Sequence, residues 1–206
     1  MAVYPERPSV SARPEATAEP SRAQQRLLGL VGPRRARTDE ENEELSQVIL
    51  TPAAWSTLRP TLYAPGRLSG GVLYGHRIDG VLHVQLVAPG GYPWWLSAPD
   101  PLDLDPHYTL GWSDCLRAQY ADAIDWAGQW IMYPDRSLAA VATDHDWMLR
   151  GAPNRLIDHE HPLLVIGYIE GVLRVRAYRY EFGSLDITPL RVVEARDTKV
   201  TEPQDV

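Results

Sequence analysis

Hydrophobic and polar positions alternate in short runs from Leu45 onward, and this alternation predicts β-strands. The clearest pattern spans residues 70–87, where two β-rich runs meet at Ile78-Asp79-Gly80, a sequence typical of a tight hairpin turn. A second hairpin is predicted over residues 162–180, with its turn at Glu170-Gly171. Shorter strands are predicted at residues 46–51 and 129–133.

Helices are predicted where a capping side chain precedes periodic apolar residues. Thr51, Ser113 and Thr143 are the candidate caps, for helices over residues 52–58, 114–127 and 144–149. The proline-rich segment 88–105 is predicted to be a loop. The resulting order of elements predicts an α+β fold, a mixed sheet flanked by helices.

The chain divides into a tail and one domain. Residues 1–44 contain five prolines and one aromatic residue, so this segment is predicted to be disordered, or to hold only a short helix. Such a helix would present Leu27, Leu28 and Leu30, either to dock on a partner or only transiently. Residues 45–197 form the predicted domain, and residues 198–206 a second tail.

Composition narrows the function classes. The chain has 206 residues and a net charge of −7, which disfavours nucleic acid as a partner. Its single cysteine excludes a disulfide framework within one chain. No apolar run approaches the ~20 residues that span a bilayer, and no leader pattern is visible, so we expect no membrane partner and a soluble, cytoplasmic protein.

Several local patterns occur together in a fixed order. Gly-Gly and an apolar strand follow Leu68, and the run Gly128-Gln-Trp-Ile-Met-Tyr-Pro-Asp precedes Val141-Ala-Thr-Asp144. Over residues 46–182 this arrangement resembles the JAB/MPN (Mov34) domain of JAMM-type zinc isopeptidases. That family has a glutamate before Thr-Gly-Gly, then His-x-His-Pro at the end of a Gly-x-Trp strand, then Ser-x-x-Asp at the start of a helix. The resemblance therefore implies a JAB/MPN-like fold.

The zinc ligands that the resemblance implies are mostly missing. Leu68 stands at the position of the general base, Ile131 and Tyr133 at the two histidines, and Val141 at the serine. Only Asp144 matches the family, and one carboxylate does not hold zinc. We therefore expect no catalytic residues, no metal and no cofactor, and we expect Leu68, Ile131 and Val141 to fill the former cavity.

Two other groups carry candidate chemistry. His159-Glu160-His161-Pro162 reads literally as His-x-His-Pro and is the rival hypothesis, a relocated metal site in a metal-dependent hydrolase. It precedes a predicted strand, whereas the family motif ends one. The run Asp144-His145-Asp146 has ligand-like residue types, but adjacent helical residues point in different directions, so the two aspartates are expected to complement the helix N-terminus.

The remaining candidates are binding residues. Tyr92, Trp94 and Trp95 lie in the predicted loop, where large aromatic side chains suit a protein interface or pack over the sheet. Arg174, Arg176 and Arg179 are predicted to decorate a strand or to recognise an acidic partner, and His76 and His83 are expected to be ordinary hairpin positions.

The sequence thus predicts a catalytically inactive JAB/MPN-like protein that acts as a protein-binding or scaffold subunit. The candidate interface comprises the 88–105 loop, the Leu27–Val31 segment and the vacated pocket around Leu68, Ile131 and Tyr133. The resemblance implies a partner such as an active JAB/MPN relative or a ubiquitin-like pathway protein, in a bacterial system that is ubiquitin-like or phage-related. An unrelated α+β module remains the third interpretation.

Overall fold

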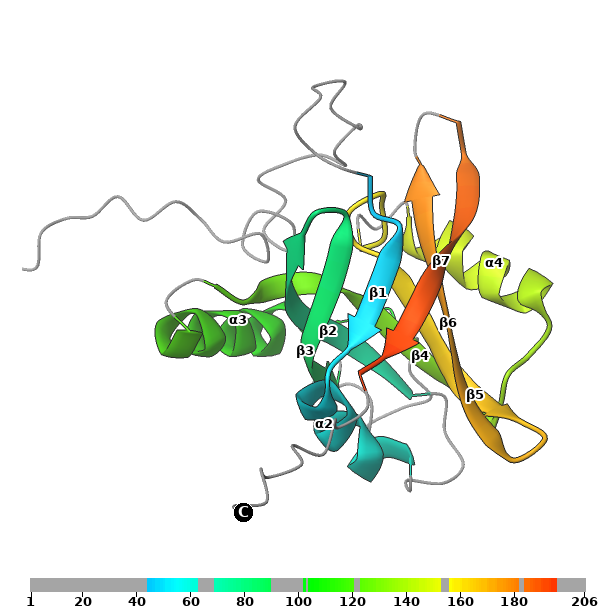
Figure 1. The fold of residues 1–206 in the computed structure, drawn as a ribbon, viewed down its shortest axis with the longest axis horizontal. Helices are drawn as coiled ribbons and strands as arrows, with labels where there is room; N and C mark the ends of the chain where they lie inside the picture. Colours follow the sequence, from blue (N-terminus) through cyan, green and yellow to red (C-terminus); the bar gives the residue numbers. More distant parts are fainter. Residues whose placement is uncertain are drawn as a thin grey trace, which may run out of the picture.

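The computed structural model describes residues 44–62, 69–89, 102, 104–120, 123–152, 156–181 and 184–195. These residues form seven strands and three helices, shown in Figure 1. In chain order they are β1 (Gln47–Leu50), α2 (Pro52–Leu62), β2 (Ser69–Ile78), β3 (Val81–Pro89), α3 (Pro106–Tyr120), β4 (Asp125–Ser137), α4 (Val141–Gly151), β5 (Leu163–Ile169), β6 (Val172–Glu181) and β7 (Asp186–Glu194). None of these helices is both long and apolar enough to cross a bilayer.

The sheet is a closed barrel with the strand order β1-β3-β2-β4-β5-β6-β7. β1 pairs in parallel with both β3 and β7, and these two ladders join the ends of the sheet. The predicted fold class, an open JAB/MPN-like mixed sheet flanked by helices, is therefore wrong. Helices are few, and the described part of the chain consists mostly of strands.

Both predicted hairpin turns are confirmed. Asp79 and Gly80 have φ angles of 48° and 68°, and Glu170 and Gly171 have φ angles of 51° and 76°. Positive φ at both central positions matches the right-handed twist of the adjoining strands. These turns fix the registers of β2 with β3 and of β5 with β6.

Two apolar clusters lie on opposite sides of the barrel wall. The inner cluster draws residues from all seven strands and from α2, and Trp130 and Leu164 are among its fully buried members. α2 lies at the end of the barrel where β1 ends (Figure 1). Thr51 caps it, since its Oγ1 accepts a hydrogen bond from the Ala54 N–H at 3.2 Å. The outer cluster lies between the wall and helices α3 and α4, through Leu116 and Met148.

One predicted helix is displaced along the sequence. α3 occupies residues 106–120, where residues 114–127 were expected, and it is capped by Asp105, whose Oδ1 accepts the N–H groups of His107 and Tyr108. Residues from Asp125 onward belong to the long strand β4. Thr143 does not cap α4, because Ala140 is at the N-cap position and makes no side-chain cap bond.

Candidate functional site

Asp144 is the centre of the most strongly connected polar cluster near the residues that the resemblance singled out. It lies on the first turn of α4, and it is fully buried. The phenol of Tyr133 on β4 donates to Asp144 Oδ1 at 3.0 Å, and the phenol of Tyr178 on β6 donates to Oδ2 at 2.9 Å. The guanidinium of Arg176, also on β6, lies 2.8 Å from Oδ2. Three segments of the chain thus converge on one carboxylate.

Electrostatics in this cluster follow from burial. Burial raises the pKa of Asp144, while the bonds from Tyr178 and Tyr133 and the charge of Arg176 act in the opposite direction. Burial and the hydrogen bond to Asp144 raise the pKa of Tyr178 to about 12. The same two causes raise the pKa of Tyr133. Both phenols are therefore neutral donors at pH 7, which is the state that a carboxylate acceptor requires.

Ile131 and Val141 occupy different environments. Ile131 is fully buried in the outer apolar cluster, as expected for a residue that fills space. Val141 is the first residue of α4 and is 46% exposed, so the prediction that it fills a former cavity is wrong. Leu68 lies outside the described residues.

Of the two aspartates predicted to complement the helix N-terminus, only Asp144 lies in the first turn of α4. Asp144 turns inward to the two phenols and Arg176, whereas Asp146 is exposed. The His145 ring packs edge-on against the Tyr178 ring, with centroids 5.5 Å apart. The cluster around Asp144 therefore contains one carboxylate, and both of its oxygens already have hydrogen-bond or ion-pair partners. Within the described ranges, no set of three His, Cys, Asp or Glu side chains is grouped to hold a metal ion.

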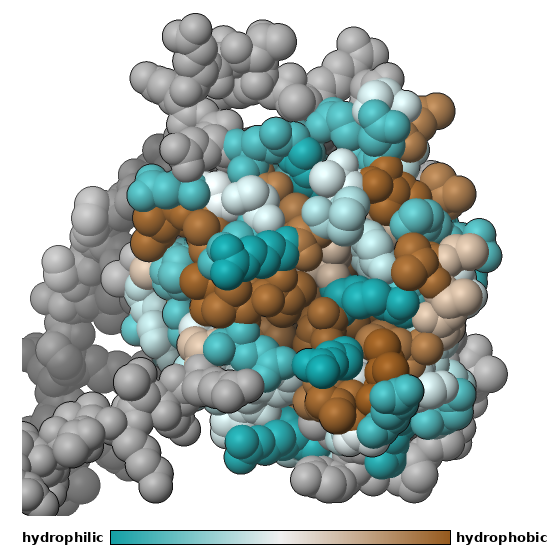
Figure 2. Space-filling view, turned by 45° about the vertical axis from the view of Figure 1, so that its right-hand side comes forward, coloured by the Kyte–Doolittle hydropathy of each residue, from teal (hydrophilic) through white to brown (hydrophobic). Residues whose placement is uncertain are grey.

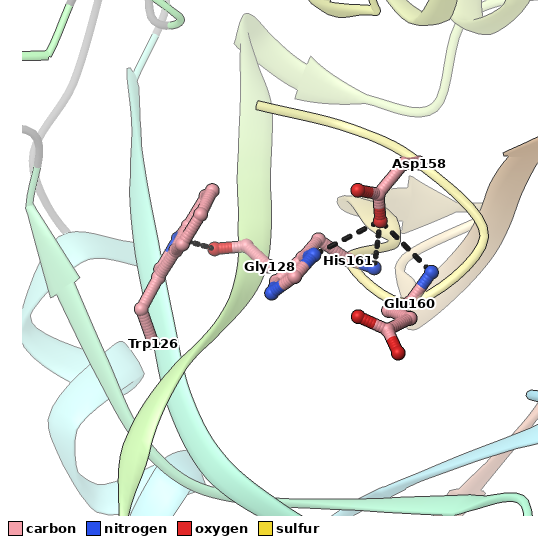
Figure 3. Close-up of polar contacts among 5 residues, drawn as sticks. All are labelled: Trp126, Gly128, Asp158, Glu160 and His161. Carbon is pink, nitrogen blue, oxygen red and sulfur yellow. Dashed lines mark hydrogen bonds and ion pairs between the residues drawn. The ribbon is translucent and has the colours of Figure 1, made fainter. Parts of the chain in front are cut away.

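The loop before β5 holds the rival motif (Figure 3). Asp158 Oδ1 accepts the backbone N–H groups of Glu160 and His161, both at 2.8 Å, and lies 2.9 Å from His161 Nδ1. The His161 ring stacks on the Trp126 ring with centroids 4.5 Å apart, and its side chain is 1% exposed. Asp158 thus holds the backbone of this loop through hydrogen bonds, and His161 packs the loop against β4. Both residues therefore have a structural role.

A pocket of about 240 Å³ lies beside this loop, at the start of β4. Its polar wall includes Arg77, Asp125 and Glu160, and the Trp126 ring contributes an aromatic surface. Asp125 Oδ1 also accepts hydrogen bonds from Ser113 Oγ and from the Trp126 N–H.

The predicted binding residues Tyr92, Trp94, Trp95, Leu27, Leu28 and Leu30 lie outside the described residues. Of the three arginines on β6, only Arg174 is exposed as expected. Arg176 pairs with Asp144 and donates to the Ala139 carbonyl at 2.7 Å, and Arg179 pairs with Glu44.

Sequence reasoning missed Arg176 and Tyr178 as partners of Asp144. Their spacing of two positions on one strand does place them on one face of the sheet, which is a readable signal. The sequence did not show that this face meets α4.

Comparisons with known proteins add a likeness of fold. No family model matches the chain, and no curated protein matches it. Among the solved structures that match is the solution structure of protein DSY2949 from Desulfitobacterium hafniense. The two sequences are 15% identical, the match covers 74% of this chain and 95% of that one, and the TM-score is 0.50. At this identity the likeness concerns the fold alone.

Proposed function

We propose that this chain is a catalytically inactive protein that acts as a binding or scaffold subunit. The observation that carries the proposal is the state of Asp144, the one residue that matches the zinc ligands of the JAB/MPN family. Its carboxylate accepts two phenol donors and pairs with Arg176. A zinc ion at this carboxylate would have to displace those donors and would repel the guanidinium.

The neighbouring positions supply no replacement ligands. The Ile131 side chain has no lone pair to offer a metal ion. The Tyr133 hydroxyl donates a hydrogen bond to Asp144, and the raised pKa of this phenol keeps it protonated at neutral pH. A bound zinc normally has three or four nitrogen, sulfur or carboxylate ligands from the protein. This cluster therefore supports a structural polar core in place of a hydrolytic centre.

A protein partner is supported by the distribution of exposed apolar side chains. Four large apolar residues belong to α4 and to the β5–β6 hairpin, which lie on the right-hand side of Figure 1, and are about half exposed: Val141, Leu149, Ile169 and Val172. Figure 2 brings this side of the molecule forward, and apolar patches lie there between hydrophilic side chains. Exposed apolar patches of this kind suit a protein interface.

The partner class follows from the resemblance and is part of the proposal. An active JAB/MPN relative or a ubiquitin-like pathway protein, in the cytoplasm of a bacterium or in a phage-related system, is the first candidate.

Two measurements test the proposal. In the first, hydrolysis of a ubiquitin-like isopeptide substrate with added Zn²⁺ is compared between the chain and Asp144→Asn. We expect no hydrolysis above that of the buffer from either protein. Hydrolysis by the natural chain above that of the buffer would overturn the claim of inactivity.

In the second, binding of a candidate partner is measured for Leu149→Asp and for Ile78→Asp. Both residues are 52% exposed, but Ile78 ends β2, away from α4. We expect Leu149→Asp to weaken binding at least tenfold and Ile78→Asp to leave it unchanged. Equal effects of the two variants would contradict an interface at α4.

A further inference from the structure

Two histidines face each other across the β2–β3 hairpin. His76 and His83 are directly opposed in the antiparallel register, so both side chains lie on the same face of the sheet. Their rings are nearly parallel, with an interplanar angle of 3° and centroids 5.1 Å apart. Both residues are partly exposed, so solvent reaches the pair.

The hairpin turn and the neighbouring strands hold the backbone around this pair in place. The tight turn at Asp79 and Gly80 closes the hairpin three residues from each histidine. A register shift between Tyr74 and Gly75 immediately precedes His76. Gly75 lies so close to β3 that a Cβ there would be 2.1 Å from the His83 carbonyl oxygen. β3 is further paired with β1, and β2 with β4, so both histidines project from a closed sheet.

The surroundings of His76 favour the neutral form of its ring. Burial, and secondarily the neighbouring His83, lower the pKa of His76. A neutral imidazole carries a free lone pair, which is the form that binds metal ions. The opposed ring of His83 places a second imidazole beside it.

We propose that His76 and His83 bind one divalent transition-metal ion of the kind that prefers imidazole, such as Zn²⁺ or Cu²⁺, through one ring nitrogen each. Zinc–nitrogen bonds are about 2.0–2.1 Å long, so two ligating nitrogens lie roughly 3.4 Å apart. The two ring centroids are 5.1 Å apart, so binding requires rotation of the rings that brings one nitrogen of each to that distance.

Water molecules complete the coordination of this ion. His76 lines the pocket of about 240 Å³ at the start of β4, which leaves room for water beside its ring. Because no group of three ligand-type side chains occurs among residues with described positions, the site has two protein ligands and an exchangeable ion. The site is separate from Asp144, and it does not depend on the proposed binding function.

Metal titration of the untagged full-length chain tests the site. ZnCl₂ is titrated by calorimetry, and Cu²⁺ by electron paramagnetic resonance, into the natural chain and into His76→Ala, His83→Ala and His107→Ala. His107 is the matched control, since its side chain is 97% exposed on α3. We expect one ion per chain, a Cu²⁺ spectrum with two coupled nitrogens, at least tenfold weaker binding in the first two variants, and unchanged binding in His107→Ala.

Other outcomes overturn the site. If His76→Ala and His83→Ala bind as tightly as the natural chain, or if the natural chain binds no ion, the pair is not a metal site. His159→Ala is titrated in the same way, and binding that is lost only in this variant would move the site to the loop before β5. Thermal unfolding of each apo variant shows that it is folded, and His83→Gln provides a less disruptive second substitution at the same position.

Discussion

The guanidinium of Arg176 lies 2.8 Å from the carboxylate of Asp144, and this pair links strand β6 to helix α4. Asp144 is fully buried, and the Arg176 side chain is 24% exposed. A charge that is removed from water needs a close opposite charge and hydrogen bonds to remain stable. Tyr133 and Tyr178 supply those bonds, so the four residues act as one unit.

Asp144→Asn is expected to destabilise the fold. The substitution leaves Arg176 partly buried without its counter-charge, and breaking a buried pair in this way costs about 3–5 kcal/mol. Urea unfolding monitored by tryptophan fluorescence measures the change in the free energy of unfolding. The control is Asp146→Asn, an exposed position on the same helix, where we expect a change within about 0.5 kcal/mol. Equal stabilities of the two variants would show that the pair contributes nothing.

The raised pKa of Tyr178 predicts that the fold loses stability at alkaline pH. Its pKa is raised to about 12 in the folded state, and an unfolded tyrosine titrates near pH 10. The stabilisation is therefore complete below pH 10 and is lost as the pH rises toward 12, with a slope of about 1.4 kcal/mol per pH unit. Between pH 9 and about 11.5, the free energy of unfolding should fall more steeply with rising pH for the natural chain than for Tyr178→Phe. Parallel curves would contradict the assignment.

Local signals in the sequence were sufficient for the hairpins and insufficient for the barrel. Asp79-Gly80 and Glu170-Gly171 identify their turns because those residue pairs tolerate positive φ. Closure depends on β1 pairing with β7, two segments from opposite ends of the domain that no local pattern connects. β7 itself was not predicted, and Pro189 in its middle is a residue that local patterns do not associate with a strand.

The boundary error at α3 has a similar local cause. Ser113 followed by Asp114 is a plausible helix cap, yet Ser113 is buried inside α3 and its hydroxyl bonds to Asp125. The true cap, Asp105, lies in a segment whose prolines suggested a loop. For the site, the motif positions identified Asp144 and Tyr133, but pairing with Arg176 depends on how α4 packs on β6.

Gly75→Ala is expected to disrupt the β2–β3 ladder. The added Cβ would lie 2.1 Å from the His83 carbonyl oxygen, so backbone must move, at a cost of roughly 1–3 kcal/mol. Gly111→Ala is the control, because the same added atom meets nothing within 4 Å on α3. Alanine is the better helix former, so this variant should gain about 0.5–1 kcal/mol. Thermal unfolding of both variants checks the opposite signs.

The loop before β5 gives the last prediction, which separates a structural role of His161 from a metal role. Asp158 Oδ1 accepts two backbone N–H groups and the His161 ring, all in a buried loop. Asp158→Ala leaves these donors without their acceptor and should destabilise the fold by about 2–4 kcal/mol. His161→Ala should also be destabilising, because it removes the ring that stacks on Trp126. Zinc binding, measured by equilibrium dialysis, should be the same in both variants as in the natural chain. A loss of bound zinc in His161→Ala at unchanged stability would instead support the relocated hydrolase site.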